Sequence, residues 1–423
     1  MSAAPPENFD LWYIIERAKY LGITDLPTLC RMPGASLRVA DRAFHSRAHG
    51  THLFKEVVGE GLWVWDLFQS FKRSTTFKLR SYSLAYVSTT FLEDSKEDVA
   101  YKEINGLQMT PHGRFKLMKY CMKDALLPAR LIGKLMLLVE NIEISRATGV
   151  SIAMICGRGL QIRLMSLLYR EAFCQEQRHV FYTRTQAERR KNSGKYEGAY
   201  VHKPVLGYHD VPVVTLDFNS LYPSIMVTKN TCVKTLVPGR SLDERMTENT
   251  LTREDVWIAE RNALPGEAAD QPAFVKYQRA PGLIPRILQK LLNLRASVKD
   301  LAARAKIAGQ SGLAAILTKR QLAIKLNCNS IYGVFGASTS FSYCPEIAAT
   351  VTATGRDMIA ETISLVETRF TRKNGYPYDA QIVYGDTDSV FVRLSQVRCA
   401  RAMRTRAYCV LGRFAPPHPD FLL

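Results

Sequence analysis

The chain lacks an uninterrupted run of about 18 apolar residues, the length that a helix needs to cross a bilayer. Its first residues, Met-Ser-Ala-Ala-Pro-Pro-Glu, lack the apolar core of a signal peptide. None of its nine cysteines belongs to a Cys-x2-Cys pair, which argues against a structural zinc or iron–sulfur site. Scattered free thiols suit a reducing compartment. These absences predict a protein with no membrane span and no cysteine-bound metal.

Acidic side chains are scarce relative to basic ones. Against 57 Lys and Arg residues there are 39 Asp and Glu residues, which gives a formal net charge of +18 at pH 7. Such a surplus is typical of proteins that are merely soluble and basic, and of proteins whose partner is a polyanion such as nucleic acid. The 423 residues exceed one ordinary core, so two or more domains are expected, and the 47% hydrophobic content is typical of a globular protein.

The most informative stretch is Tyr384-Gly385-Asp386-Thr387-Asp388-Ser389, in which two carboxylates stand one residue apart. The residues on either side, 380–383 and 390–392, are β-prone and largely apolar, so the pattern predicts a hairpin with the acids at its tip. Like charges this close repel one another and are costly near a packed sheet unless a cation neutralises them. Considered by itself, the stretch also fits an ordinary acidic turn.

Two further stretches change that balance. Residues 211–226 predict an apolar strand that ends at Asp217 and runs into Asp-x-x-Ser-Leu-Tyr-Pro-Ser. Residues 325–333 contain Lys-x3-Asn-Ser-x-Tyr-Gly, which places Lys325 and Asn329 on one face of a helix. In this order, the three stretches resemble the three polymerase motifs of family B DNA polymerases.

The resemblance implies an α+β fold of the right-hand polymerase type, with an antiparallel palm sheet and a pair of fingers helices. The implied activity is template-directed DNA synthesis, in which a primer 3′-oxygen attacks the α-phosphorus of a deoxynucleotide and pyrophosphate leaves. Two Mg²⁺ ions about 3.5–4 Å apart suit this charged transition state. The resemblance makes Asp217 and Asp388 the metal ligands, and Asp386 a weaker, auxiliary candidate. Acids that merely cap turns are the alternative.

The resemblance also implies a nucleotide site. The residues expected to contact the incoming nucleotide are Ser220, Leu221, Tyr222, Arg295, Lys299, Lys325, Asn329, Tyr332 and Gly333. Cationic side chains and an amide would bind the triphosphate, together with backbone N–H groups at a helix start after Asp217. Tyr222 would stack beneath the sugar and exclude a 2′-hydroxyl, while Tyr332 and Gly333 would pack against the new base pair. A solvated basic helix face and a core tyrosine are the alternatives.

The N-terminal third resembles the 3′→5′ exonuclease domain of the same polymerases. Residues 8–22 contain Asn-x-Asp and predict a helix that ends at Gly22, and Tyr-x3-Asp follows at Tyr120 and Asp124. The resemblance implies that Asp10 and Asp124 ligate metal and that Tyr120 orients the attacking water, although Asp10 by itself fits an N-cap. The family's Asp-x-Glu motif does not occur ahead of Asp10, so the exonuclease is expected to be an inactive remnant.

Domain boundaries follow from the same resemblance. A partial exonuclease domain, a helical connector, a first part of the palm, the fingers and a second part of the palm are expected at residues 1–130, 131–200, 201–280, 281–336 and 337–423. The fingers are predicted from helical patterns over 282–306 and about 313–332, joined by a turn at 308–312. Family members continue from the last residues into a thumb that grips the primer duplex, so the thumb is expected to be missing. Other predictions are packing helices over 131–182, an exposed loop over 184–195, an irregular segment over 240–273, a helix over 346–369 and a basic helix over 393–413.

Residues 79–84 and 96–99 resemble the delta-type replicative polymerases of eukaryotes or large DNA viruses. The implied partners are primer–template DNA, dNTP, and a sliding clamp with accessory subunits, in the nucleus or at a viral replication site. The main alternative is a fragment that binds nucleic acid and nucleotide without catalysis. RNA polymerases and reverse transcriptases also carry paired aspartates on a hairpin, but Tyr222 and the Lys-x3-Asn-Ser-x-Tyr-Gly helix fit a DNA polymerase better.

Overall fold

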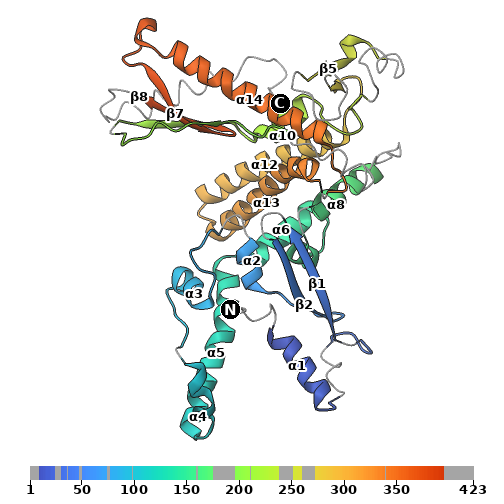
Figure 1. Cartoon of the computed structure of the whole chain (residues 1–423), viewed down its shortest axis with the longest axis vertical. Coiled ribbons are helices and arrows are strands. Elements are labelled where there is room, and N and C mark those ends of the chain that lie inside the picture. The colour runs from blue at the N-terminus through green and yellow to red at the C-terminus, as the bar shows by residue number, and fades with distance from the viewer. Residues whose placement is uncertain are drawn as a thin grey trace. The chain divides into compact units, whose positions relative to one another are not determined.

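The computed structural model describes residues 9–23, 30–35, 37–46, 50–73, 77–97, 99–158, 161–174, 196–209, 211–237, 251–259, 272–338 and 340–394. The chain divides into two compact units, Met1–Gly159 and Leu160–Leu423, each with its own hydrophobic core (Figure 1). Helices and antiparallel strands occur in both units, in agreement with the predicted α+β class. No helix among the described residues is long and apolar enough to cross a membrane.

The first unit consists mainly of helices with one strand pair. Its elements are α1 (Phe9–Tyr20), β1 (Arg38–Ser46), β2 (Gly50–Val58), α2 (Leu67–Arg73), α3 (Leu84–Leu92), α4 (Ile104–Gln108), α5 (Pro111–Lys134), α6 (Leu137–Thr148) and α7 (Ile152–Gly157). Strands β1 and β2 pair antiparallel. The helix predicted over 8–22 is present as α1 and ends just before Gly22, whose φ of +69° lies in the left-handed region that glycine favours.

The longest helix of this unit, α5, has a clear start signal. The hydroxyl of Thr110 accepts a hydrogen bond from the N–H of Gly113 at 3.0 Å, and Pro111 occupies the first turn. Beyond its middle, α5 contributes Leu131 to a core that it shares with α2, α3 and the start of α6; the buried members of this core are Phe71, Val87, Leu131 and Leu137.

The second unit combines long helices with a four-stranded sheet and a two-stranded sheet. Its elements are α8 (Gln161–Phe173), β3 (Val201–His202), β4 (Val213–Asp217), α10 (Leu221–Thr228), β5 (Val256–Ile258), β6 (Ala273–Val275), α12 (Leu283–Ile307), α13 (Ser311–Gly336), α14 (Pro345–Arg369), β7 (Ala380–Asp386) and β8 (Ser389–Leu394). The helix predicted over 346–369 is confirmed as α14.

The predicted acidic hairpin is present as β7 and β8. These strands lie at the centre of a sheet with the order β3-β7-β8-β4, in which every neighbouring pair is antiparallel. Thr387, at the turn between them, has φ +54°, in the left-handed region. Strand β4 ends at Asp217 as predicted, and its pairing with β8 places Asp217 opposite Ser389. Two segments far apart in the sequence therefore bring their acids to one end of the same sheet.

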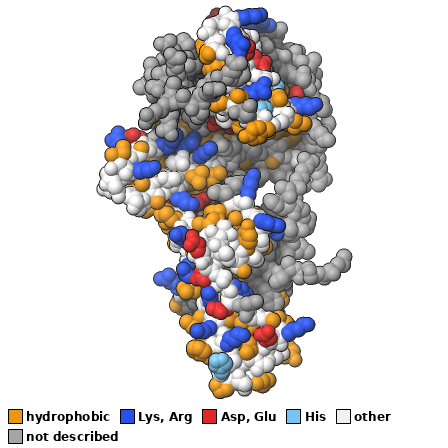
Figure 2. Space-filling model, turned by 90° about the vertical axis from the view of Figure 1, so that its left-hand side faces the viewer, with side chains coloured by type: hydrophobic (Ala, Val, Ile, Leu, Met, Phe, Trp, Pro, Cys, Tyr) orange, Lys and Arg blue, Asp and Glu red, His pale blue; other side chains and the backbone are white. Residues whose placement is uncertain are grey.

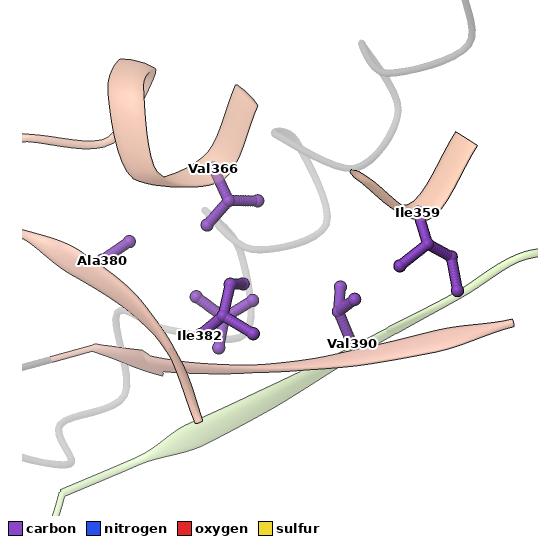
Figure 3. Close-up of a cluster of buried hydrophobic side chains, with 6 residues drawn as sticks. Ile359, Val366, Ala380, Ile382 and Val390 are labelled. Atoms are coloured by element: carbon purple, nitrogen blue, oxygen red, sulfur yellow. The ribbon is translucent and has the colours of Figure 1, made fainter. Parts of the chain in front are cut away.

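The hairpin is held from one side by α14. Figure 3 shows the cluster of buried side chains that α14, β7 and β8 share, whose members are Ile359, Val366, Ala380, Ile382, Val390 and Val392. On β8 buried residues alternate with more exposed ones, because successive strand side chains point to opposite faces. Truncation of such a buried aliphatic side chain typically costs about 2–5 kcal/mol, so this packing fixes the hairpin firmly against the helix.

The predicted helix pair is present as α12 and α13, which lie side by side (Figure 1). The connection contains Gly309 at φ +71°. The first helix buries apolar side chains at helical spacing, at Leu283, Ile287, Leu288 and Leu291. Helix α13 continues to Gly336, beyond its predicted end near residue 332, because the buried Val334 and Phe335 extend its packed face.

Part of the segment predicted as irregular between residues 240 and 273 is ordered into strands. Strand β5 pairs antiparallel with β6, which brings Val256 opposite Val275. Short strands such as these, with only three residues each, leave too brief a pattern for sequence periodicity to detect. The loop predicted over 184–195 lies outside the described residues. Of the helix predicted over 393–413, the structure describes residues 393 and 394, which belong to strand β8, so the helix prediction is wrong at these two positions.

In Figure 2, Lys and Arg side chains are spread over the described part of the visible surface, and Asp and Glu side chains lie among them. This distribution agrees with the net charge of +18. A positive surface attracts polyanions over distances longer than a hydrogen bond and raises their rate of association.

Candidate functional site

The acidic end of the sheet is built by β4, β7 and β8. The backbone N–H of Phe218, the residue that follows Asp217, donates a hydrogen bond to the carbonyl of Asp388 at 2.8 Å. Asp386 lies at the end of β7, where its carboxylate accepts a hydrogen bond from the hydroxyl of Thr387 at 2.9 Å. The structure thus brings together all three aspartates that the sequence motifs single out.

The electrostatics of this end of the sheet centre on Asp388. Burial raises the pKa of Asp388 above its ordinary value, and the negative charge of Asp217 raises it further, with a smaller contribution from Asp386. Lys325 of α13 acts in the opposite direction on the same carboxyl group. The two aspartates therefore lie close enough to repel each other, and a cation between them would relieve this repulsion.

The carboxylate pair could hold a divalent cation. Among the described residues, no group of three or more His, Cys, Asp or Glu side chains is gathered so as to hold a metal ion. Mg²⁺ is usually bound by one or two carboxylates and completes its octahedral shell with water and substrate phosphate. The pair of Asp217 and Asp388, repelling each other as their electrostatics indicate, is a donor set of this kind.

The start of α10 lies next to this acidic end and is linked to α12. Ser220, the residue before α10, has φ +54° and ψ +52°. Arg295 of α12 donates from Nη1 to the hydroxyl of Ser220 at 3.0 Å and from Nε to the side-chain oxygen of Gln321 on α13 at 3.5 Å. One guanidinium group therefore joins three helices. The N–H groups at the start of a helix, such as those of Leu221 and Tyr222, have no acceptors within the helix and suit an anion.

Two of the predicted nucleotide-site residues, Tyr222 and Tyr332, are in ring contact. Their centroids lie 4.5 Å apart with the planes inclined at 45°. The hydroxyl of Tyr332 lies 3.4 Å from that of Tyr196, within hydrogen-bond distance. Burial raises the pKa of Tyr332 and also that of Tyr222, where the charge of Asp388 adds to the effect. Tyr222 thus lies near enough to the acidic end of the sheet for the charge of Asp388 to affect its pKa.

The remaining predicted nucleotide-site residues lie on the helix pair. Lys325 and Asn329 are both exposed on α13, one turn apart, as predicted. Lys299 is exposed on α12, one turn beyond Arg295. Gly333 is exposed as well, and a Cβ added there would meet no protein atom within 4 Å, so no neighbour within the chain requires a glycine at this position.

The residues predicted for the exonuclease lie in the first unit. Tyr120 and Asp124 occupy neighbouring turns of α5. Lys96 joins them, because its Nζ lies 2.8 Å from Oδ2 of Asp124 and 4.7 Å from the ring centroid of Tyr120. The other carboxylate oxygen of Asp124 is buried without a hydrogen-bond partner. Asp10 lies in α1, and its side chain is outside the described part of the chain.

Sequence patterns did not reveal how the residues around the two tyrosines are connected. Residues 196–199, Tyr-Glu-Gly-Ala, carry no local pattern that predicts contact with Tyr332. Arg356 binds the backbone of this segment from α14, but a single arginine in a long helical pattern carries no local signal. Contacts of this kind depend on the tertiary fold and are invisible to local periodicity.

Comparison with known proteins identifies the family. The model of DNA polymerase family B matches residues 150–408, which is more than half of the chain. The exonuclease domain of DNA polymerase family B matches residues 7–87. The family predicted from the three motifs is therefore confirmed.

Curated relatives extend the similarity over most of the chain. The DNA polymerase delta catalytic subunit of Glycine max is 41% identical over 415 residues, covering 97% of this chain and 36% of that protein. The subunits of the same name from Candida albicans and Bos taurus are 40% and 39% identical, covering 91% and 97% of this chain and 35% of each relative. The chain thus spans about a third of the length of these relatives. With a family model that covers more than half of its residues, this chain belongs to DNA polymerase family B.

Proposed function

We propose that the chain carries out template-directed DNA synthesis, adding deoxynucleotides to a primer 3′-hydroxyl in DNA replication. The observation that carries this proposal is the pairing of β4 with β8, which places Asp217 beside the Asp386–Asp388 turn. The family assignment and the names of the relatives, all DNA polymerase delta catalytic subunits, support it.

Asp217 and Asp388 are proposed to hold two Mg²⁺ ions, with Asp386 in an auxiliary position. Such ions would lower the barrier by offsetting charge on the attacking and leaving oxygens of the in-line displacement. The mutual repulsion of the two carboxylates, which raises the pKa of Asp388, supports this role because it is the condition that a bound cation relieves.

The helix pair is proposed to bind the triphosphate. Lys325 lies near enough to Asp388 to lower its pKa, so its ammonium group can approach phosphates held by a metal at that carboxylate. Arg295, fixed by Ser220 at the start of α10, adds a second cation, and Lys299 and Asn329 extend the same surface. Leu221, Tyr222 and Ser220 would contribute backbone N–H groups from the helix start.

Tyr222 is proposed to select the sugar. Its ring packs against that of Tyr332. Burial and the charge of Asp388 raise the pKa of its hydroxyl group. A rigid ring at this position would stack beneath a deoxyribose and collide with a 2′-hydroxyl. Tyr332 and Gly333 would then line the new base pair on the same helix.

The proposed function assigns each part of the chain to a domain of a right-hand polymerase. The four-stranded sheet with α10 and α14 is the proposed palm, in two sections over residues 201–280 and 337–423. Helices α12 and α13 are the proposed fingers over 281–336. The segments 1–130 and 131–200 are the proposed partial exonuclease domain and the connector.

Primer–template DNA and dNTP are the proposed partners. The net charge of +18 favours DNA as a ligand, because neutralisation of phosphates by Lys and Arg releases counterions. By similarity to the delta catalytic subunits, a sliding clamp and accessory subunits are further proposed partners, and the nucleus or a viral replication site is the proposed location.

Addition of a single nucleotide tests this function. The purified chain, in excess over a labelled primer–template, is expected to add one matched dNTP when Mg²⁺ is present and none in EDTA. Asp217→Asn and Asp388→Asn should each leave less than about one-tenth of the wild-type rate, since loss of a metal clamp costs several kcal/mol. Asp386→Asn should have a smaller effect. Asp300→Asn, an exposed position on α12, is the control and should not change the rate.

The outcomes separate catalysis from binding. If Asp217→Asn or Asp388→Asn extends the primer as fast as the wild-type chain does, the substituted aspartate is not a metal ligand. Binding of the primer–template without any extension by the wild-type chain would contradict the proposed synthesis and favour a non-catalytic nucleic-acid-binding protein.

A further inference from the structure

Residues 196–202 form a single strip of backbone that contacts both halves of the proposed polymerase site. At one end, the hydroxyl of Tyr196 lies 3.4 Å from that of Tyr332 on α13. At the other end, β3 pairs with β7 so that Val201 lies opposite Asp386. The carbonyl of Tyr200 also accepts a hydrogen bond at 3.0 Å from the N–H of Thr387, in the acidic turn itself. We call residues 196–202 the bridging strip.

Helix α14 grips the middle of the bridging strip. Arg356 donates from Nη1 to the carbonyls of Glu197 at 3.0 Å and Gly198 at 2.8 Å, and its Nη2 lies 3.2 Å from the Glu197 carboxylate. Thr352, which is 1% exposed, donates its hydroxyl to the same Glu197 carbonyl at 2.9 Å. Together these hydrogen bonds fix a backbone segment that has almost no regular structure of its own.

The grip is matched by close packing around the tyrosines. A Cβ added to Gly336 on α13 would overlap the hydroxyl of Tyr196, and one added to Gly355 on α14 would lie 3.2 Å from the Tyr222 ring. Tyr332 contacts both of these tyrosines: its hydroxyl lies within hydrogen-bond distance of that of Tyr196, and its ring is in contact with that of Tyr222. The position of Tyr196 is therefore transmitted to Tyr332 and, through the ring contact, to Tyr222.

We propose that Arg356 is a positioning residue for sugar selection, which rests on the proposed function of the chain. By fixing the bridging strip, Arg356 holds Tyr196 against Tyr332, and this contact keeps the Tyr222 ring where a 2′-hydroxyl would collide with it. The contacts of Arg356 are with the backbone of the strip and with the Glu197 carboxylate. It acts through the strip and the tyrosines.

The chemistry of the contact calls for arginine rather than another cation. A guanidinium group donates several hydrogen bonds in one plane, whereas an ammonium group is a compact point charge on a flexible stem. Arg356 contacts two carbonyls and one carboxylate at once, and this geometry fixes the strip in orientation as well as in position. Lysine would retain the charge but would not fix the orientation to the same degree.

The test measures discrimination between dNTP and rNTP in single-nucleotide addition by the purified chain under single-turnover conditions. Tyr196→Phe removes one hydroxyl, Gly336→Ala displaces it, and Arg356→Ala releases the strip. Each is expected to lower the ratio of dNTP to rNTP addition roughly three- to tenfold, which is about the value of one or two hydrogen bonds. Arg356→Lys should restore part of the ratio.

Matched controls separate positioning from general damage. Gly312→Ala lies on the same helix as Gly336, and its added Cβ would meet no atom within 4 Å. Arg304→Ala removes an exposed arginine of α12 that pairs with Asp300 in its own helix at 2.8 Å. Both should keep the wild-type ratio. The ratio is the deciding quantity because a folding defect lowers the amount of active protein and changes the two rates equally.

Failure of this inference can be distinguished from failure of the proposed function. If the wild-type chain adds neither nucleotide, the proposed synthesis is contradicted and the inference falls with it. If the wild-type chain discriminates and Tyr196→Phe, Gly336→Ala and Arg356→Ala all keep its ratio, the positioning role is wrong while the synthesis stands. If Arg356→Ala does not fold, Tyr196→Phe and Gly336→Ala decide the outcome without it.

Discussion

The fold around Asp388 disfavours the charge of this carboxylate. Burial and the charge of Asp217 raise its pKa, which means that the folded chain binds the carboxyl proton more tightly than the unfolded chain does. The stability that this proton confers is complete below the unfolded pKa near 3.8 and is lost as the pH rises through the higher pKa of the folded state. Above that window, and without a divalent cation, the ionised Asp388 lowers the free energy of unfolding.

Asp388→Asn is therefore expected to raise the melting temperature of the chain at pH 7 in EDTA, because the amide removes the repulsion. Mg²⁺ should raise the melting temperature of the wild type more than that of the variant, since the variant has lost a ligand. Differential scanning calorimetry measures both effects. Glu361→Gln, at an exposed position of α14, is the control and should show neither. A melting temperature of Asp388→Asn below that of the wild type in EDTA would show that the carboxylate is not repelled there.

At the level of elements, the start of α5 illustrates how tightly a helix junction can be packed. Gly113 lies in the first turn of α5, and a Cβ added there would overlap the carbonyl oxygen of Leu107 in α4. The obstacle is backbone, which cannot move aside as the end of a side chain can. Gly133, near the other end of the same helix, is exposed and has no atom within 4 Å of the Cβ position.

The same substitution should consequently have opposite effects at these two positions. Gly113→Ala is expected to lower the free energy of unfolding by about 1–3 kcal/mol, because the two helices must move apart. Gly133→Ala is expected to raise it by about 0.5–1 kcal/mol, since alanine favours the helix. Urea unfolding with hydrogen exchange of α4 and α5 as the local readout measures the difference. Equal effects of the two changes would mean that α4 does not pack on α5 as described.

The helices and strands show which parts of the fold can be predicted from local sequence patterns. The β7–β8 hairpin, the strand ending at Asp217 and the α12–α13 pair were predictable, because each has a hydrophobic period or turn signal confined to adjacent residues. The β5–β6 pair was not, since three-residue strands carry no measurable period.

In the candidate site, the functional residues were predictable from the sequence, but the contacts that position them were not. The sequence motifs predicted Asp217, Asp386 and Asp388, and the structure gathers these aspartates at one end of the sheet. The grip of Arg356 on residues 197 and 198 was not predictable. It joins positions more than 150 residues apart through backbone carbonyls, which every residue type carries. Sequence patterns identify side chains with distinctive chemistry far better than they identify the contacts that position them.

For the whole molecule, charge and family membership point to the same class of partner. The surplus of basic residues gives the chain a positive field, and members of the family that it belongs to are DNA polymerases. A large part of duplex affinity comes from phosphate contacts and weakens steeply with salt. Any measurement that relies on a bound primer–template therefore needs low salt.

The proposal that Asp217 and Asp388 jointly ligate metal is tested most directly by iron-directed cleavage of the whole chain. Fe²⁺ replaces Mg²⁺ in the presence of dNTP and a chain-terminated primer–template at low salt, and peroxide with ascorbate then generates hydroxyl radicals at the bound ion. Mass spectrometry of the fragments is expected to find backbone cleavage clustered at residues 217–220 and 385–389. Excess Mg²⁺ should suppress this cleavage, and Asp217→Asn should abolish it. Cleavage confined to other segments, or an unchanged pattern in Asp217→Asn, would contradict the assignment.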